Sequence, residues 1–274
     1  MRLYLVVSMV LGLVVGVSAQ VVINEVGWSG TIASGYDEWI ELFNPGEEAV
    51  DLSGWTLLIG EREMPLSGEI PAGGFFLLER TDDSTVADVE ADFIYKGALP
   101  NAGAVIQLLD PNGDVVDTAN RGCPEGWWAG GGDVRASMER ISPEIPDSPV
   151  AWRPGTEGGA HDAEGNPIHG TPGAPNAASS VALPVSLHLP GEELFGQVEI
   201  AWEVEGGGEG LSVSLYLSQD GGESWELVAQ GLPLVGVQAV DTSQLKEGEV
   251  LFAVGVFDEV GARGGAVSKA TVSR

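Results

Sequence analysis

The only local cluster of histidine and carboxylate side chains in the sequence contains His161, Asp162, Glu164 and His169. Neutral imidazoles and carboxylates can bind zinc, and a loop could fold around such an ion. Their spacing matches no recognised zinc pattern, and the glycine-rich sequence around them offers no rigid support for ligand geometry. We therefore interpret the cluster as part of a solvated loop and assign no metal ligand.

A second oxygen-rich segment, Asp110-Pro111-Asn112-Gly113-Asp114, begins like a calcium-binding loop with side-chain oxygens at alternate positions. The sixth position of such a loop should be glycine and is Val115, and the twelfth should be glutamate and is Arg121. Asn112 and Gly113 tolerate the left-handed conformation that tight turns require. A hairpin turn is therefore the better interpretation, calcium is the alternative, and no other cofactor is predicted.

The sequence contains no recognisable catalytic constellation. It has no Gly-x-Ser-x-Gly elbow and three histidines, of which His188 falls within an expected strand. Glu38 and Glu41 lie on one expected strand next to Asp37, but alternation points their side chains to opposite faces. They therefore do not converge as an acid/base pair should, and we predict no catalytic residue.

Two adjacent tryptophans, Trp127 and Trp128, lie in the Pro/Gly-rich segment at residues 123–133. Successive side chains of an extended segment point in opposite directions, so both indoles cannot face one core there. One indole could form an exposed aromatic platform for sugars or peptides, as loops of β-sandwiches do. The alternative is that the loop folds over the sandwich edge and covers both rings. These tryptophans are the best candidate binding residues in the sequence.

Residues 218–225, SQDGGESW, match the Asp-box pattern Ser-x-Asp-x-Gly-x-x-Trp, and so resemble the boxes of sialidases and other propellers. That resemblance implies a folding device in which Ser218 and Asp220 cap a turn, a glycine takes a positive φ, and Trp225 packs beneath the hairpin. A sialidase would need several boxes, an arginine cluster and a tyrosine nucleophile. With one box present, the structural interpretation is preferred.

Short β-strands must position these residues. The chain contains 40 glycines and 16 prolines with valine-rich runs between them, and it shows almost no helical periodicity. Its length supports two domains. Strands are expected at 21–26, 38–43, 55–59, 74–79, 92–95, 104–109, 114–117, 137–141 and 150–153, and then at 185–189, 198–204, 213–218, 225–230, 237–242, 250–257 and 266–272. Residues 154–180 are expected to be poorly ordered.

Five separated blocks resemble the bacterial lamin-tail domain in the order of that family. They are INEV at 23–26, the segment 37–58 with IPAGGFFLLER at 70–80, NAGAVIQLLDPNGDVVD at 101–117 and GTPGAPN at 170–176. The resemblance implies an immunoglobulin-like β-sandwich over residues 20–176 and no shared catalytic residues. Residues 177–184 are expected to be a linker. Residues 185–274 resemble a fibronectin type III or related immunoglobulin-like module, so the fold class is all-β with two sandwiches in tandem.

The first residues predict the compartment. Arg2, the apolar run from Leu3 to Val17 and the Val17-Ser18-Ala19 site are typical of a secretory signal peptide at residues 1–19. The run falls short of the ~20 residues that span a bilayer, so no stable membrane insertion is expected after cleavage. The mature protein is expected to be secreted or periplasmic.

Charge and cysteine content narrow the range of partners. A formal net charge of -29 repels nucleic acid, so nucleic acid is not an expected partner. Cys123 is the only cysteine, which excludes a disulfide within the chain and leaves it as a small apolar side chain or an intermolecular bridge. We predict a secreted, non-catalytic binding, adhesion or scaffold protein whose partner is an extracellular protein or polysaccharide. The alternative is an accessory module of an extracellular hydrolase, or a weak hydrolase with an unrecognised metal site.

Overall fold

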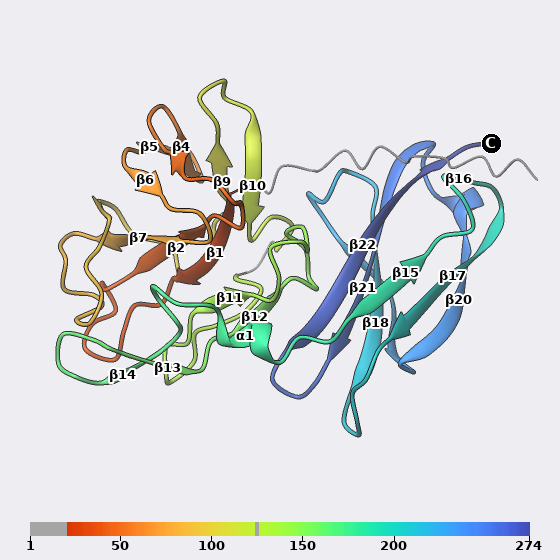
Figure 1. Ribbon diagram of the computed structural model, residues 1–274. Coiled ribbons are helices and arrows are strands. Elements are labelled where there is room, and N and C mark those ends of the chain that lie inside the picture. Colours follow the sequence, from red (N-terminus) through yellow and green to blue (C-terminus); the bar gives the residue numbers. More distant parts are fainter. Residues whose placement is uncertain (1–20, 124–125) are drawn as a thin grey trace, which may run out of the picture.

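The computed structural model describes residues 21–123 and 126–274, and the predicted signal peptide at residues 1–19 lies outside them. The described chain is almost entirely β-strand, as the glycine and valine pattern predicts, and it forms two sandwiches (Figure 1). The all-β, immunoglobulin-like fold class is therefore confirmed. In the described part, no helix is long and apolar enough to cross a membrane.

The first sandwich packs a six-stranded sheet against a four-stranded sheet. The larger sheet has the order β12-β11-β1-β2-β7-β8, with the bounds β12 Trp152–Pro154, β11 Met138–Arg140, β1 Val22–Gly27, β2 Trp39–Phe43, β7 Phe75–Arg80 and β8 Phe93–Tyr95. The smaller sheet has the order β10-β9-β4-β5, with β10 Val115–Ala119, β9 Ile106–Leu109, β4 Thr56–Ile59 and β5 Arg62–Pro65. All pairs are antiparallel except β7 with β8.

Two short ribbons and one helical turn complete the first half of the chain. The ribbons pair β3 (Val50–Asp51) with β6 (Glu69–Ile70), and β13 (Glu157–His161) with β14 (Pro167–His169). Helix α1 (Ala177–Ser180) follows, at the junction of the two halves (Figure 1). The expectation that residues 154–180 are poorly ordered is therefore wrong. Hydrogen bonds to the larger sheet order this segment even though its apolar content is low.

The second sandwich packs a three-stranded sheet against a five-stranded one. Its smaller sheet has the order β15-β17-β20, with β15 Val185–His188, β17 Gln197–Val204 and β20 Val235–Asp241. Its larger sheet has the order β16-β22-β21-β18-β19, with β16 Glu193–Leu194, β22 Ala262–Val272, β21 Gly248–Phe257, β18 Ser212–Ser218 and β19 Glu226–Leu232. A 3₁₀ turn, η1 (Thr242–Gln244), follows β20.

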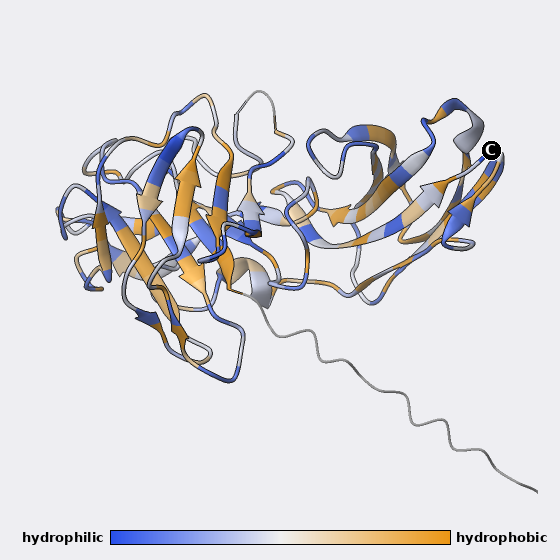
Figure 2. Cartoon of the chain, turned by 90° about the horizontal axis from the view of Figure 1, so that it is seen from above, coloured by the Kyte–Doolittle hydropathy of each residue, from blue (hydrophilic) through white to orange (hydrophobic). Residues whose placement is uncertain are grey.

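Each sandwich has its own apolar core, and hydrophobic residues, orange in Figure 2, lie along the strands of both halves. Alternation places Val198, Ile200 and Trp202 of β17 inside, as predicted from VEIAWEV. Burying each such side chain contributes roughly 1.5–3 kcal/mol.

Apolar contacts also join the two sandwiches. Val150, which is fully buried, sits over the paired glycines Gly255 and Gly265 of β21 and β22. A Cβ atom added at either glycine would lie 2.5 Å from a Val150 methyl group, so only glycine permits this approach. The core of the first sandwich extends across the junction to Ala253 and Ala262.

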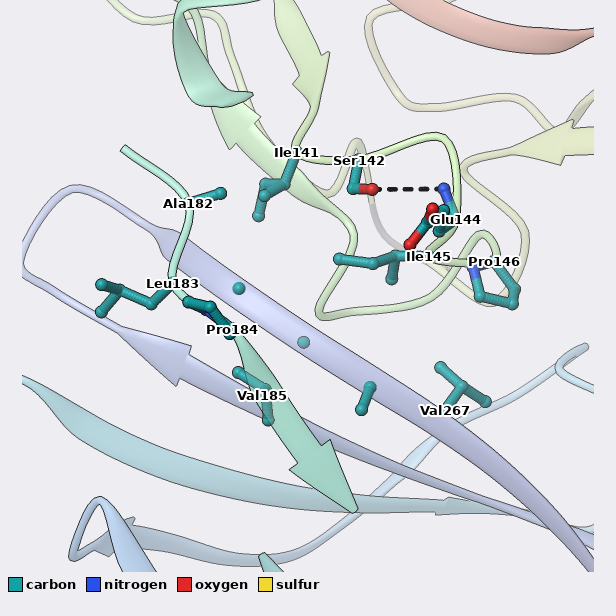
Figure 3. Close-up of a pocket in the computed structure, with 13 residues that line it drawn as sticks. Ile141, Ser142, Glu144, Ile145, Pro146, Ala182, Leu183, Pro184, Val185 and Val267 are labelled. Atoms are coloured by element: carbon teal, nitrogen blue, oxygen red, sulfur yellow. Dashed lines mark hydrogen bonds between the residues drawn. The ribbon is translucent and has the colours of Figure 1, made fainter. Parts of the chain in front are cut away.

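A groove of about 560 Å³ lies beside this junction (Figure 3). Ile141, Ile145 and Pro146 line it from the first half, and Leu183 and Val267 line it from the second. In the groove wall, the Glu144 amide donates to Ser142 Oγ at 3.2 Å.

Candidate binding surface

In the structure, the histidine and carboxylate side chains of the predicted cluster do not converge on one site. Asp162 closes the turn of the β13–β14 hairpin by accepting from the amides of Glu164 and Asn166 at 3.0 and 2.9 Å. His161 points elsewhere, with Nδ1 2.8 Å from Asp88 Oδ2. Within residues 21–123 and 126–274, no group of three or more His, Cys, Asp or Glu side chains is arranged to hold a metal ion.

A row of buried glutamates crosses the six-stranded sheet, and no pattern in the sequence predicted it. Strand register places Glu25 of β1 directly between Glu139 of β11 and Glu41 of β2. Glu79 of β7 lies on the same face but offset from this line, since it pairs with Trp39, while Leu77 is the residue opposite Glu41. We call these four residues the glutamate row, and all four have 0% exposure.

Main-chain amides from outside the sheet satisfy the glutamate row. The Thr171 amide donates to Glu25 Oε1 at 3.0 Å, and the Ala178 amide donates to Glu139 Oε2 at 2.8 Å. Segment 170–178, which includes the predicted GTPGAPN block, is therefore held against the sheet face by carboxylates. It leads directly into the second sandwich.

The other two glutamates are satisfied in the same way. The Gly173 amide donates to Glu41 Oε2 at 2.5 Å, and Asn24 Nδ2 donates to Glu41 Oε1 at 2.8 Å. The amides of Thr85 and Val86 donate to Glu79. Glu38 takes different partners, the Arg80 guanidinium and the Leu99 amide, so it does not join Glu41, as alternation predicted.

Burial sets the protonation of the glutamate row. It raises the pKa of Glu41 to about 8 and that of Glu79 to about 7. The pKa of Glu25 is raised well above its usual value by burial and then by the neighbouring Glu41 and Glu139 carboxylates. A general acid or base must reach a substrate within hydrogen-bond distance, and these side chains expose no surface. The row is therefore part of the scaffold.

Two loops of the first sandwich, residues 28–37 and 126–136, pack against each other; we call them the aromatic loop pair. The rings of Trp28 and Trp127 stack with centroids 5.7 Å apart and planes inclined by 8°. Trp28 Nε1 donates to the Ala129 carbonyl at 2.9 Å, and the Arg135 guanidinium donates to the Ser29 carbonyl. These contacts fix one loop against the other.

The predicted binding residues Trp127 and Trp128 are both half-buried. Trp127 Nε1 donates to the Pro100 carbonyl at 2.9 Å, while Trp128 Nε1 donates to the Arg121 carbonyl at 3.3 Å. The two indoles point to different partners, as their adjacency requires. They anchor the loop to the sandwich, in line with the covered alternative, and their contact with a ligand stays a prediction.

Tyr36 is the exposed aromatic ring of the aromatic loop pair. Its exposed fraction is 74%, and Ile32 and Val134 of the same loops are also exposed. The Arg80 guanidinium carbon lies 5.4 Å from the centroid of the Tyr36 ring, and Arg80 is itself held by Glu38 at 2.9 Å. The sequence alone does not single out Tyr36, because nothing in its local pattern distinguishes an exposed ring from a buried one.

The Asp-box residues form the predicted turn between β18 and β19. Ser218 Oγ donates to Asp220 Oδ1 at 2.7 Å, and the Ser224 amide donates to Asp220 Oδ1 at 2.9 Å. Gly221 and Gly222 both have positive φ, at 70° and 91°, so the structural interpretation of the box is confirmed.

Trp225 lies beside Gly222 of its own hairpin, as expected, but it does not pack into the second core, and this corrects the expectation. It is half-buried against the core of the first sandwich, beside Gly122. A Cβ atom at Gly122 would lie 2.8 Å from Trp225 Cδ1. The hairpin tip therefore serves as a contact between the sandwiches, and Arg121 Nη2 pairs with Glu223 Oε1 at 3.0 Å beside it.

The segment Asp110–Asp114 is a hairpin turn between β9 and β10, as preferred over a calcium loop. Asp110 Oδ1 accepts from the amides of Asn112 and Asp114 at 2.8 and 2.9 Å, and Gly113 has a φ of 85°. The Asp110 carboxylate thus caps the turn. Cys123 is half-buried nearby in the chain.

The family model of the lamin tail domain matches residues 16–122 of this chain. No curated protein matches the chain significantly. The resemblance inferred from the five sequence blocks is confirmed over this range. The fibronectin-like assignment of the C-terminal part fits its all-β structure and stays a prediction.

Solved structures similar to the chain have low identity. A β-glucuronidase from Ruminococcus gnavus is 12% identical over 86% of this chain and 36% of its own, with a TM-score of 0.25. An endo-β-1,4-mannanase from Thermotoga petrophila is 15% identical over 34% of this chain and 20% of its own, with a TM-score of 0.27. Dimeric latent PorU from Porphyromonas gingivalis is 13% identical over 86% of this chain and 18% of its own, at 0.26. The chain thus spans about a third or less of these proteins, and such scores say nothing about activity.

Proposed function

We propose, starting from the lamin tail domain in the N-terminal half of this chain, that the protein is a secreted, non-catalytic binding or scaffold module. An immunoglobulin-like lamin tail domain supports a binding or accessory role. The finer proposal is that the aromatic loop pair contacts an extracellular protein or polysaccharide.

Tyr36 carries this proposal. An exposed ring held from one side by Arg80, on loops fixed by the Trp28–Trp127 stack, loses little conformational entropy when it contacts a ligand. Aromatic anchors of this kind often dominate the binding energy of a surface. The surrounding Ile32 and Val134 add apolar area.

The experiment compares three proteins lacking residues 1–19: wild type, Tyr36→Ala and Phe195→Ala. Phe195 is the matched control, because it is an exposed aromatic residue, at 54%, in the second sandwich. Each protein is tested by biolayer interferometry against immobilised cell-wall polysaccharides and an extracellular protein fraction. We expect at least one ligand whose affinity falls about tenfold in Tyr36→Ala and is unchanged in Phe195→Ala.

Equal binding by wild type and Tyr36→Ala would contradict the proposed surface. New reducing ends released from a polysaccharide by the wild-type protein would overturn the non-catalytic assignment and favour the hydrolase alternative.

A further inference from the structure

Strand β20 is an open edge of the second sandwich. Within the described chain its sheet neighbour is β17, and the two strands pair through seven consecutive residues without a register shift. The other seven-residue edge strand, β19, has two irregularities against β18. Edge strand β15 has four residues, and β8 and β12 have three each. Shortness and bulges protect sheet edges from pairing with other chains, and β20 has neither protection.

Hydrogen bonds at both ends of β20 show which residues face the open edge. The Val204 amide donates to the Leu234 carbonyl at 2.9 Å just before the strand, and the Thr242 amide donates to the Gly196 carbonyl at 2.8 Å just after it. In an antiparallel pair, bonded positions alternate along the strand. Even-numbered residues of β20 therefore bond to β17, and odd-numbered residues direct their amides and carbonyls outward.

The outward-directed residues are Val235, Val237 and Ala239. The Ala239 carbonyl accepts from the side-chain amide of Gln238 at 3.0 Å, an exposed donor that an incoming strand can replace. Asp241, the last residue of β20, begins the turn into η1, so the edge ends there. The edge thus offers a short, regular row of main-chain donors and acceptors.

The side chains beside this edge define the chemistry of a partner. Val235 and Val237 are 62% and 56% exposed on the outer face of the sheet. Their register partners on β17 are Glu203 and Ala201, and Glu199 faces Ala239 in the same way. An apolar stripe at the edge is therefore bordered by carboxylates on the same face. The chain's net charge of -29 opposes a second copy in this position.

We propose that β20 accepts an extended segment of a partner protein as an additional strand, and that the side chains this segment adds to the outer face of the sheet include both β-branched apolar residues and lysine or arginine. Its main chain pairs with the outward groups of Val235, Val237 and Ala239. On that outer face its apolar side chains cover the exposed valines, while its cations reach across β20 to Glu199 and Glu203, because every second residue of a strand shares one face. This surface is on the second sandwich and does not depend on the aromatic loop pair.

The probe is a capped synthetic peptide as long as β20, in which valine and lysine take turns at every second position and threonine fills the positions between them, so that valine and lysine share one face. Fluorescence anisotropy measures its binding to the chain lacking residues 1–19, and hydrogen exchange with mass spectrometry locates it. We expect slower exchange in the peptide fragments that contain Val235, Val237 and Ala239. Two control peptides are the valine–glutamate equivalent and the valine–lysine peptide with alternate amides N-methylated, and both should bind at least about tenfold more weakly.

The matched protein variants are Val237→Pro and Val237→Thr. Proline removes the outward amide of Val237 without removing a bond to β17, and threonine keeps that amide and the branched shape. We expect Val237→Pro to weaken binding about tenfold or more and Val237→Thr about threefold or less. Circular dichroism and thermal melting confirm that both variants fold, and if Val237→Pro does not, the N-methylated peptide decides the question.

Several results would overturn the proposal. These are the absence of peptide binding, equal binding of the glutamate or N-methylated peptide, or protection that maps away from β20. A concentration-dependent dimer of the wild type, lost in Val237→Pro, would identify a second copy as the occupant instead.

Discussion

At the scale of single residues, Glu41 shows how burial converts an ordinary acid into a pH-dependent element of stability. It is fully buried between Asn24 and the Gly173 amide, and its pKa rises to about 8 from a usual value of 4.5. The native state therefore holds a proton that the unfolded state has released between these two pH values. The stability that Glu41 contributes is greatest below about pH 4.5 and is lost as the pH rises to about 8.

Replacing Glu41 with glutamine should flatten this dependence. The wild-type free energy of unfolding should fall between pH 4.5 and 8, by at most about 1.4 kcal/mol per pH unit for this group, and the fall should be smaller in Glu41→Gln. Urea denaturation at several pH values measures it. Glu69→Gln, at an exposed position of β6, is the control for the same change in charge. Identical pH profiles for wild type and Glu41→Gln would contradict this assignment.

The Asp box provides a second prediction at this scale. Asp220→Ala removes the bonds to Ser218 and Ser224 and should lower the free energy of unfolding by about 1 kcal/mol. Trp225→Ala removes a half-buried ring from the junction and should cost about 2 kcal/mol. Chemical denaturation measures both. A larger loss for Asp220→Ala than for Trp225→Ala would show that the turn, and not the contact between sandwiches, is the main contribution of the box.

At the scale of elements, alternation and turn residues predicted most of the strands of the main sheets. Strand β5 of the four-stranded sheet was missed because REMP has a single apolar side chain, Met64, before its proline. VEIAWEV was recognisable as β17 because every second side chain is apolar. Strands β3, β6 and β16 were missed because two residues contain no periodic pattern. Strands β13 and β14 were missed because EGGAH and PIH show no alternation and contain one β-branched residue, Ile168, between them.

The candidate site was less predictable for a related reason. A glutamate in a strand normally indicates a solvated face, so Glu25 and Glu41 gave no sign of burial. Their partners are amides more than 130 residues later in the chain. Trp127 and Trp128 were recognisable by composition, whereas the exposure of Tyr36 depends on how two distant loops meet.

Segment 155–180 provides a prediction about an element. Because the glutamate row binds its amides, limited proteolysis of the native protein should not cut between residues 170 and 178. Glu25→Ala leaves the Thr171 amide without its carboxylate and should make this segment the first to be cut. Mass spectrometry of the fragments checks both results. Early cleavage of the wild type within residues 170–178 would support the earlier expectation of an unordered segment.

At the scale of the whole molecule, the two sandwiches are joined by a partly buried ion pair as well as by apolar contacts. Arg153 of β12 donates from both terminal nitrogens to Asp258, each at 3.0 Å, and Arg263 approaches the same carboxylate at 3.3 Å. Although partial burial of Asp258 opposes this, hydrogen bonds from Arg153 and from the Gly261 and Val260 amides hold its pKa well below the usual range.

Removing this pair should uncouple the two halves. The wild type should unfold in one calorimetric transition, and Arg153→Ala should lose on the order of 3 kcal/mol and separate into two transitions. Lys269→Ala breaks an exposed pair with Glu249 and should cost less than about 1 kcal/mol without separating them. Two transitions already present in the wild type would show that the junction does not couple the halves.

Export is the remaining prediction at this scale. N-terminal sequencing of protein from the culture medium or periplasm should begin at Gln20 or its cyclised form, because Val17-Ser18-Ala19 is a small-residue cleavage site. An intact Met1 in a membrane fraction would contradict both cleavage and release.

The glutamate row also imposes an order on the synthesis of the protein. Glu25 belongs to an early central strand, yet the Thr171 amide that it needs is 146 residues later in the chain. Until the ribosome has produced that segment, closing the first half would bury carboxyl groups without their donors, so we expect it to close late. A contact of such long range slows folding, because a large loop must form before any bond rewards it. We therefore expect the nascent chain to stay open until its first half is almost complete, which is the state that the predicted export would require.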